Sequence, residues 1–286
     1  MAQPVIENVS DTAFMVAAHR AVESERTDAL FRDPLAATLS GERGKRIIAN
    51  LPRQALTGWS IAVRTVLIDE MIVAAVAGGA DTVVNLGAGL DTRPYRMDLP
   101  EGLHWIEVDY APMIELKEAR LAGEVPRCQV ERIRMDLSDV PARRKMLAEI
   151  GARSKNMLVL TEGVIPYLSV EDVAVLADDL RGLDPVRAWI VDYFSKETIR
   201  YRKKSARTFE NAPFKFEPDD WFAFFAAHGW RPREERFLAI ESERLRRPAP
   251  FTPWIRLWMH VARRFMAREK REAIRRFAGY FVLERV

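Results

Sequence analysis

The stretch TVVNLGAGLDTRPYR, residues 82–96, decides the fold. Its apolar start predicts a buried strand, and a Gly-x-Gly follows directly at Gly87 and Gly89. Glycine lets the backbone turn tightly and approach a ligand without a Cβ in the way. In open α/β sheets, ligands bind just beyond the carboxyl ends of the strands. The stretch therefore predicts a ligand-binding turn, while a tight turn that holds no ligand would use the same residues.

Strands and helices alternate around this turn. Before it, apolar residues recur every three or four positions over 55–77 until Gly78 and predict a helix. The elements expected after it are strands at 82–86, 104–109, 130–135, 157–161 and 188–193, helices at 112–122, 141–150 and 170–181, and a further strand near 233–240. Strands separated by helices predict an α/β fold, in which a mostly parallel sheet carries helices on both faces.

Composition limits the class of protein. The chain has 286 residues, of which 48% are hydrophobic and 30% charged, as is typical of a globular protein that buries its own core. A single cysteine, Cys128, excludes an internal disulfide and most cysteine-based metal sites, so we expect no metal. The start lacks a signal-peptide pattern, and charges interrupt every apolar run, so we expect a cytoplasmic protein without a transmembrane segment.

Two acidic residues follow the next strands. Asp109 ends the strand at 104–109, twenty residues after Gly89, the spacing at which a carboxylate meets ribose hydroxyls in nucleotide-binding folds. Asp136 follows the strand at 130–135, where it can accept from an adenine amino group or simply stabilise a turn. Thr92 occupies the place of the third glycine of a dinucleotide-binding fingerprint, which weakens the case for an NAD(P)-dependent oxidoreductase.

Six ordered blocks of the chain resemble the leucine carboxyl methyltransferase family, in particular its bacterial S-adenosylmethionine-dependent O-methyltransferases. The blocks are DTAFMVAAHRAVESERTDALFRDPLA (11–36), IAVRTVLIDE (61–70), NLGAGLDTRPYR (85–96), IEVDYAPMIELK (106–117), MDL (135–137) and TEGVIPYLS (161–169). The resemblance implies a class I methyltransferase, a Rossmann-like fold with a seven-stranded sheet. Its units would be an N-terminal helical cap (1–54), a cofactor-binding core (55–240), a late helical insertion (241–277) and a last strand (278–286), all in one domain.

The resemblance also implies which residues bind S-adenosylmethionine. Arg64 matches the arginine that pairs with the methionine carboxylate, a role suited to the guanidinium fork. Glu162 matches the glutamate near the amino end of the cofactor, whereas Asp91 and Arg93 match a signature that braces the loop. The remaining expected contacts are Gly87 and Gly89 with the methionine and ribose portion, Asp109 with the ribose, and Asp136 and Leu137 with the adenine, and Ala88 and Tyr110 are also expected to bind the cofactor.

The methyl acceptor is expected to be a carboxylate or a hydroxyl of a small metabolite. A carboxylate is already ionised at neutral pH and needs no general base. A hydroxyl would need one, and the acceptor-site candidates are His19, Tyr193 and Tyr167, of which Tyr167 is expected to line the site. A catalytically silent binding protein with a cofactor fold is the other alternative to an enzyme.

The chain departs from the family at Ser138. Eukaryotic members that methylate a protein C-terminus carry an arginine directly after the Asp-Leu pair, where this chain has Ser138. The lost carboxylate clamp argues against a protein substrate and favours a small metabolite. Arg200, Arg202 or Arg246 is a candidate substitute for that clamp.

The late insertion is strongly basic. Residues 241–276 hold eleven Lys and Arg against four Glu, a net charge of +7 that leaves −4 for the remaining chain. One long helix is expected over 254–277, with Trp254, Trp258, Val261 and Phe265 along one face. Such helices bind anionic membranes or acidic partners, but we expect this face to pack on the sheet or on a second subunit of a homodimer. No specific nucleic-acid binding is expected.

Overall fold

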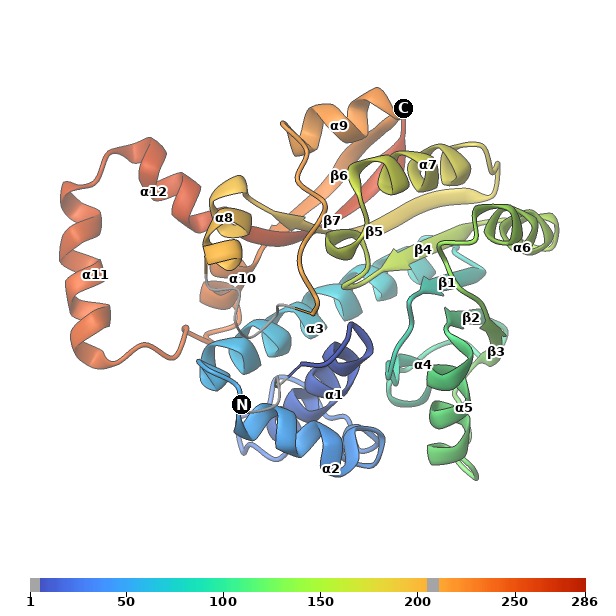
Figure 1. The fold of residues 1–286 in the computed structure, drawn as a ribbon, viewed down its shortest axis with the longest axis horizontal. Coiled ribbons are helices and arrows are strands. Elements are labelled where there is room, and N and C mark those ends of the chain that lie inside the picture. The colour runs from blue at the N-terminus through green and yellow to red at the C-terminus, as the bar shows by residue number, and fades with distance from the viewer. Residues whose placement is uncertain (1–5, 205–210) are drawn as a thin grey trace.

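The computed structural model describes residues 6–204 and 211–286, and a seven-stranded sheet forms the centre of this described part (Figure 1). Across the sheet the strands run in the order β3 (Gln129–Arg134), β2 (His104–Asp109), β1 (Thr82–Leu86), β4 (Met157–Thr161), β5 (Val186–Phe194), β7 (Ala278–Arg285) and β6 (Trp230–Phe237). The first five are parallel, whereas β7 runs antiparallel to both of its neighbours. The predicted α/β fold with a mostly parallel sheet is confirmed.

The strand order places a ligand-binding point between β1 and β4. From β1 the chain moves outward to β2 and β3, then returns to the other side of β1 to form β4 and β5. At such a reversal the connections leave in opposite directions and open a crevice beyond the carboxyl ends of the strands. The Gly87 turn, which follows β1, lies at this crevice.

Both faces of the sheet are covered, as side-chain alternation along each strand requires. Val83 and Ile190 point to the face covered by α3 (Gln54–Ala77), where they join Leu67 in one core cluster. Val84 and Val191 point to the opposite face, which α6 (Val140–Ala152), α7 (Val170–Arg181) and α9 (Trp221–Ala227) cover. The sheet therefore packs an apolar core on each of its two sides.

The remaining helices surround the carboxyl edge of the sheet. The N-terminal pair packs together under that edge, with the chain after β1 and β2 beside it (Figure 1). The N-terminal pair is α1 (Ser10–Ser24) and α2 (Ala36–Ala49), and the other helices in this region are α4 (Arg93–Arg96), α5 (Ala111–Arg120), the 3₁₀ turn η1 (Ile165–Tyr167), α8 (Lys196–Lys204) and α10 (Leu238–Arg244). In the described residues, no helix combines the length and the hydropathy that a membrane span requires.

Two sequence predictions near the C-terminus are wrong in detail. The strand expected at 233–240 is β6, which starts earlier and ends at Phe237, because its partner strand β7 begins at Ala278, opposite this end of β6. Residues 238–240 instead begin α10. The single long helix expected over 254–277 is two helices, α11 (Pro253–Phe265) and α12 (Arg268–Arg275), since Ala267 adopts an extended conformation between them.

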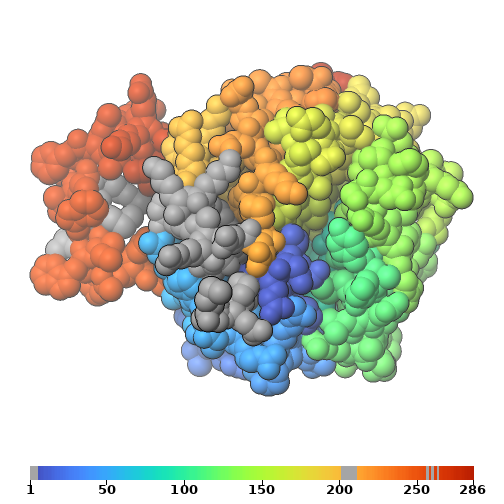
Figure 2. All heavy atoms as spheres, viewed as in Figure 1, coloured from blue at the N-terminus to red at the C-terminus, as the bar shows by residue number. Residues whose placement is uncertain are grey.

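The aromatic face of α11 does not pack on the sheet, contrary to one of the two packings expected from the sequence. Trp254, Trp258 and Phe265 are 78%, 70% and 84% exposed. Residues 253–275 form an arm that stands away from the sheet beyond α8 and α10 (Figures 1 and 2). The expected insertion between the last two strands is present, but its apolar side is left open to solvent.

Candidate functional site

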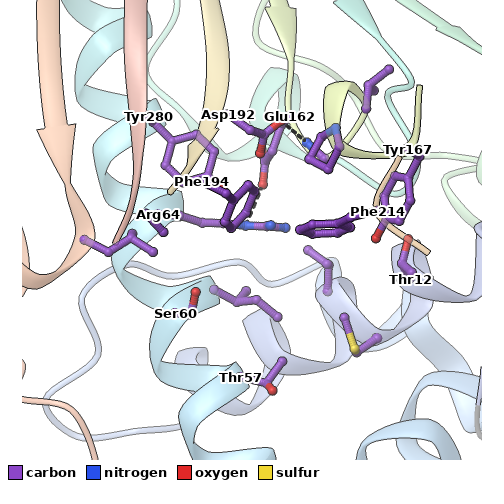
Figure 3. A pocket seen from close by; sticks show the side chains of 18 of the residues that line it. Thr12, Thr57, Ser60, Arg64, Glu162, Tyr167, Asp192, Phe194, Phe214 and Tyr280 are labelled. Atoms are coloured by element: carbon purple, nitrogen blue, oxygen red, sulfur yellow. Dashed lines mark hydrogen bonds and ion pairs between the residues drawn. The ribbon is translucent and has the colours of Figure 1, made fainter. Parts of the chain in front are cut away.

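A cavity of about 1460 Å³ lies beyond the carboxyl ends of β1, β2, β4 and β5. It is bounded by α1 and α3 on one side and by α10 and α12 on another, so both the N-terminal helices and the late insertion contribute to its walls. Figure 3 shows Arg64 reaching from α3 into its middle. Residues from all six sequence blocks that resemble the family line this cavity.

The glycine turn forms one wall of the cavity. Gly87 and Gly89 have φ of +69° and +48°, in the left-handed region that suits glycine. A Cβ on Gly87 would lie 2.4 Å from Cγ2 of Val164, and one on Gly89 would lie 3.1 Å from Cβ of Ala13. The turn therefore depends on glycine both for its backbone conformation and for the close approach of neighbouring segments.

Asp109 links the turn to the end of β2. Its Oδ2 accepts from the backbone N–H of Gly89 at 2.6 Å, and its Oδ1 accepts from that of Tyr110 at 2.7 Å. Burial raises the pKa of Asp109 against the effect of these two donors. Each carboxylate oxygen keeps a second lone pair, and Asp109 lines the cavity, so this side chain can accept two further hydrogen bonds from a ligand diol.

The next strand end supplies a smaller and more exposed contact region. Leu137 and Ser138 line the cavity, whereas Asp136 is exposed at its rim. The side chain of Asp136 accepts from the N–H of Ser138 at 2.8 Å and from its Oγ at 2.7 Å. Hydrogen bonds from Ser138 and from the Tyr110 hydroxyl hold the pKa of Asp136 below its usual value. Asp136 is thus an ionised acceptor beside the cavity.

Beside the glycine turn, where β4 and β5 end, a charged cluster lines the cavity. Arg64 Nε lies 3.0 Å from Oε1 of Glu162, and its guanidinium also bonds the hydroxyl of Tyr280. Burial disfavours the charged guanidinium, but the surrounding oxygens, that of Tyr280 foremost, offset it and raise the pKa of Arg64 further. Asp192 accepts from the N–H of Gly163 at 2.9 Å, and burial raises its pKa to about 7.

Arg93 pairs with the carboxylates of this cluster from outside the cavity. It does not line the cavity; it donates to Asp91 at 2.6 Å, to Asp69 at 2.7 Å and to Glu162 at 2.8 Å. Three carboxylates around one buried guanidinium fix the rotamer of Glu162, whose pKa the two arginines Arg93 and Arg64 lower despite burial. The geometry agrees with the bracing role expected for Asp91 and Arg93.

Thr92, which stands in place of a third fingerprint glycine, bonds the segment that follows α1. Its Oγ1 donates to Oδ2 of Asp33 at 2.6 Å, and the same oxygen accepts from Arg20 Nε at 2.8 Å. Arg20 also donates to the carbonyl of Leu90, so the segment after β1 is tied to α1 at two points. The hydroxyl thus anchors the helical cap where a dinucleotide-binding fold would bring a helix close to its strand.

Beyond the charged cluster the cavity is mostly apolar. Tyr167 packs edge-on against Phe214 at 5.5 Å between ring centroids, and Phe214 contacts Phe194 at 5.1 Å. Figure 3 shows these three rings around the free space past Arg64, with Thr12 at the far end. Phe251, Ile274 and Phe277 extend the apolar lining toward the arm. Tyr167 lines the cavity, and its contact with a methyl acceptor stays a prediction.

His19 and Tyr193, the two other acceptor-site candidates, do not line this cavity. His19 is buried beside Gly58, and burial, with the charge of Arg64, lowers its pKa to about 4. Tyr193 stacks on Phe281 at 4.9 Å, on the opposite face of the sheet, where it borders a smaller cavity of about 260 Å³. Neither side chain is placed to touch a ligand in the large cavity.

The arginines predicted to bind an acceptor carboxylate are not found in the described lining of the cavity. Arg200 and Arg246 do not line the cavity, and the side chain of Arg202 lies outside the described residues. Two lysines line it instead: Lys215, just past Phe214, and Lys270 on α12. Both side chains are exposed at the mouth, so they are hydrated cations rather than buried ones.

Asp192 and Tyr280, which were not predicted from the sequence, complete the charged cluster. Asp192 interrupts an otherwise apolar strand, in AWIVDY, and a carboxylate in a buried strand is the signal that could have found it. Tyr280, in GYFVLERV, carried no comparable signal because tyrosine is common in strands. Its contact with Arg64 depends on β7 pairing beside β5.

Comparison with known proteins agrees with this geometry. The family model described as leucine carboxyl methyltransferase matches residues 13–181. The chain belongs to the leucine carboxyl methyltransferase family. A relative from Parafrankia sp., provisionally named an S-adenosyl-L-methionine-dependent methyltransferase, is 32% identical over 261 residues, covering 85% of this chain and 83% of its own length. A similarly named Streptomyces avermitilis protein is 32% identical over 246 residues, covering 77% and 82%.

Solved structures show the same fold at low sequence identity. A Thermobifida fusca protein, provisionally described as a methyltransferase, has a TM-score of 0.56 at 14% identity and covers 96% of this chain and 94% of its own. A DUF574 family protein from Streptomyces avermitilis has a TM-score of 0.54 at 12% identity, with coverages of 94% and 97%. Membership of the family confirms the prediction that the chain is an S-adenosylmethionine-dependent methyltransferase with a class I fold.

Proposed function

We propose that the chain transfers the methyl group of S-adenosylmethionine to an oxygen of a small acceptor with an apolar body, and that a carboxylate is the preferred acceptor group. The observation that supports this most is the cavity itself. At about 1460 Å³ it exceeds the range of roughly 300–1,000 Å³ typical of a single small-molecule site. It therefore has room for a cofactor and an acceptor side by side.

The residues present fit the cofactor. Gly87 and Gly89 leave space that side chains would fill, and Asp109 keeps lone pairs for ribose hydroxyls. Arg64 and Glu162 provide opposite charges for the carboxylate and amino groups of the methionine portion. Tyr110 and Asp136 would face the adenosine, and the expected contacts are completed by Ala88 and Leu137, which also line the cavity.

When bound, S-adenosylmethionine supplies a methyl group already activated on a sulfonium. The protein's contribution is then to hold the acceptor in line and to exclude water. The rings of Phe194, Phe214 and Tyr167 form an apolar wall beside the free space. Lys215 and Lys270 at the mouth can attract an anionic acceptor. An ionised carboxylate needs no base in this arrangement.

A hydroxyl acceptor is the second candidate, and Asp192 is the observation that favours it. A base with a pKa near neutrality is best suited to take a proton at physiological pH, and Asp192 has a pKa of about 7 and lines the cavity. Asp192 accepts from the Gly163 N–H and bonds the Tyr280 hydroxyl, and a carboxylate has further lone pairs for a substrate hydroxyl. The two acceptor classes therefore differ in whether Asp192 takes part.

A paired substrate screen separates them. Methyl transfer to small carboxylic acids with aromatic or aliphatic bodies is compared with transfer to phenols of the same size, with the wild type and with Asp192→Asn. We expect methyl esters, a flat rate between about pH 6 and pH 8 and little effect of Asp192→Asn on kcat. Transfer to phenols alone, with a rate that rises through about pH 7 and disappears in Asp192→Asn, would overturn the carboxylate proposal in favour of the hydroxyl.

The lysines give a second test. Lys215→Met with Lys270→Met is expected to raise KM for a carboxylate acceptor several-fold and to leave S-adenosylhomocysteine affinity unchanged, because both side chains lie at the mouth, away from the charged cluster. Arg200→Met is a matched control that removes a nearby cation outside the cavity lining. An equal change in KM for the double variant and for the control would contradict a role in acceptor recognition.

A further inference from the structure

The arm formed by α11 and α12 carries an apolar surface that the described fold does not cover. Trp254, Trp258, Val261 and Phe265 recur at four-, three- and four-residue steps. At about 100° per residue, these positions fall within about 60° of one another on the helix. All four side chains are exposed, three of them by at least two thirds. Monomeric proteins rarely leave such a row of large apolar groups open to water.

The same arm is the most basic part of the chain. Residues 253–276 contain eight Lys and Arg and two Glu, a net charge of +6 in 24 residues. By helical spacing, positions 256 and 263 of α11, both arginine, fall opposite the aromatic row, and Arg264 falls to one side of it. α12 adds cations at Arg268, Lys270, Arg271 and Arg275. An aromatic row backed by arginines is the pattern of helices that lie in the interface of an anionic bilayer.

We propose that the arm docks the enzyme on an anionic lipid surface, with the aromatic row of α11 inserted at the headgroup level and the cations of the arm beside the lipid phosphates. Tryptophan is suited to this depth because its ring is apolar and its N–H finds polar partners. The arm stands clear of the sheet and of the N-terminal helices, so a flat surface can reach it (Figure 2). The docking is peripheral, and it concerns the arm alone.

Charge argues for lipid over a second copy of the chain. Two copies that met arm to arm would bring two segments of +6 together, which is unfavourable without an acidic partner. An arm docked on the body of another copy would need an apolar acceptor surface. The exposed large apolar residues described outside the arm and its approach are spread over α1, α3, α9, three connecting segments and the C-terminus: Val22, Val73, Phe222, Val9, Tyr110, Val125 and Val286.

The position of the arm connects this surface to the catalytic cavity. Lys270, Ala273 and Ile274 of α12 line the cavity mouth. When α11 lies on a bilayer, the mouth is therefore held close to the lipid surface. An acceptor with an apolar body would enter the cavity from that side.

Vesicle sedimentation with the full chain tests the proposal. The wild type is expected to co-sediment with vesicles of phosphatidylcholine containing roughly 30% phosphatidylglycerol, and not with phosphatidylcholine alone, and salt is expected to weaken the binding. Trp254→Ser, Trp258→Ser and Phe265→Ser combined should lower the bound fraction by about tenfold or more. Val125→Ser, which removes an exposed apolar side chain outside the arm, is the matched control and should bind as the wild type does.

Two further measurements keep the test decisive. S-adenosylhomocysteine affinity of the triple variant should equal that of the wild type, because the three residues do not line the cavity, and this reports that the fold is intact. Failure of the wild type to bind anionic vesicles at low salt would overturn the proposal. A wild type that sediments as a dimer, together with a triple variant that is monomeric, would assign the face to a second copy instead.

Discussion

Replacing Gly87 with alanine is expected to destabilise the fold by an amount that separates backbone strain from steric clash. Gly87 has a φ of +69°, and a Cβ there would lie 2.4 Å from Cγ2 of Val164, whereas carbon atoms in contact normally lie about 3.5–4.0 Å apart. Gly163 also has a φ of +69°, but a Cβ there would have no neighbouring atom within 4 Å. The two glycines thus share the backbone conformation and differ in the space around them.

The magnitudes follow from that difference. Gly163→Ala should lower the free energy of unfolding by about 1–2 kcal/mol, the cost of an L-residue in the left-handed region. Gly87→Ala carries the same cost and about 1–3 kcal/mol of overpacking in addition, so about 2–5 kcal/mol in total. The entropy that alanine removes from the unfolded chain is the same for both and cancels in the comparison.

Urea unfolding followed by circular dichroism measures both variants under the same conditions. Gly87→Ala combined with Val164→Ala should recover most of the overpacking but not the backbone cost, and the Val164→Ala single variant completes the cycle. Equal losses for Gly87→Ala and Gly163→Ala would refute the steric reasoning. A double variant no more stable than Gly87→Ala would show that Val164 is not the side chain in conflict.

Three further outcomes are expected. Asp109→Ala should weaken S-adenosylhomocysteine binding by about 1.5–3 kcal/mol in calorimetry, since a charged acceptor is lost; unchanged affinity would move the ribose contact elsewhere. Burial raises the pKa of Asp192 to about 7, so between about pH 4 and pH 7 the folded state keeps a proton that the unfolded state releases. The free energy of unfolding should therefore fall as the pH rises from about 4 to about 7. Asp192→Asn should flatten this fall, and an unchanged pH profile would contradict it. Lys117→Met leaves the buried Glu107, 2.7 Å from the Lys117 Nζ, without that partner, and should cost about 3 kcal/mol in urea unfolding; a neutral effect would show that the ion pair contributes nothing.

The local patterns of the sequence predict much of the fold because they depend on near neighbours. The strand at 82–86 and the helix at 170–181 have the predicted bounds, since one is a continuous apolar run and the other opens on a Ser169–Asp172 capping box. The end of β6 and the break at Ala267 were not predictable in this way. The first depends on where the partner strand starts, and the second on a single extended residue inside a helical pattern.

The residues of the candidate site likewise differ in whether local sequence patterns predict their position. Arg64, Gly87, Gly89, Asp109 and Glu162 all line one cavity, as the sequence predicts, because each lies in a motif whose residue types and spacing are legible in the chain. His19 was misplaced, since a helix has several faces and the sequence does not say which one turns toward the cavity.

The amino-acid sequence alone determines the glycine turn after the first strand, the acidic residue twenty positions later, and the family to which these motifs belong. Each depends on spacing along one strand, turn or helix. Only the tertiary structure decides that Asp192 and Tyr280 join Arg64, and that the aromatic row of α11 stays exposed. Those facts depend on which strands lie side by side and on which helix faces find a partner, and both are set by packing between segments far apart in the chain.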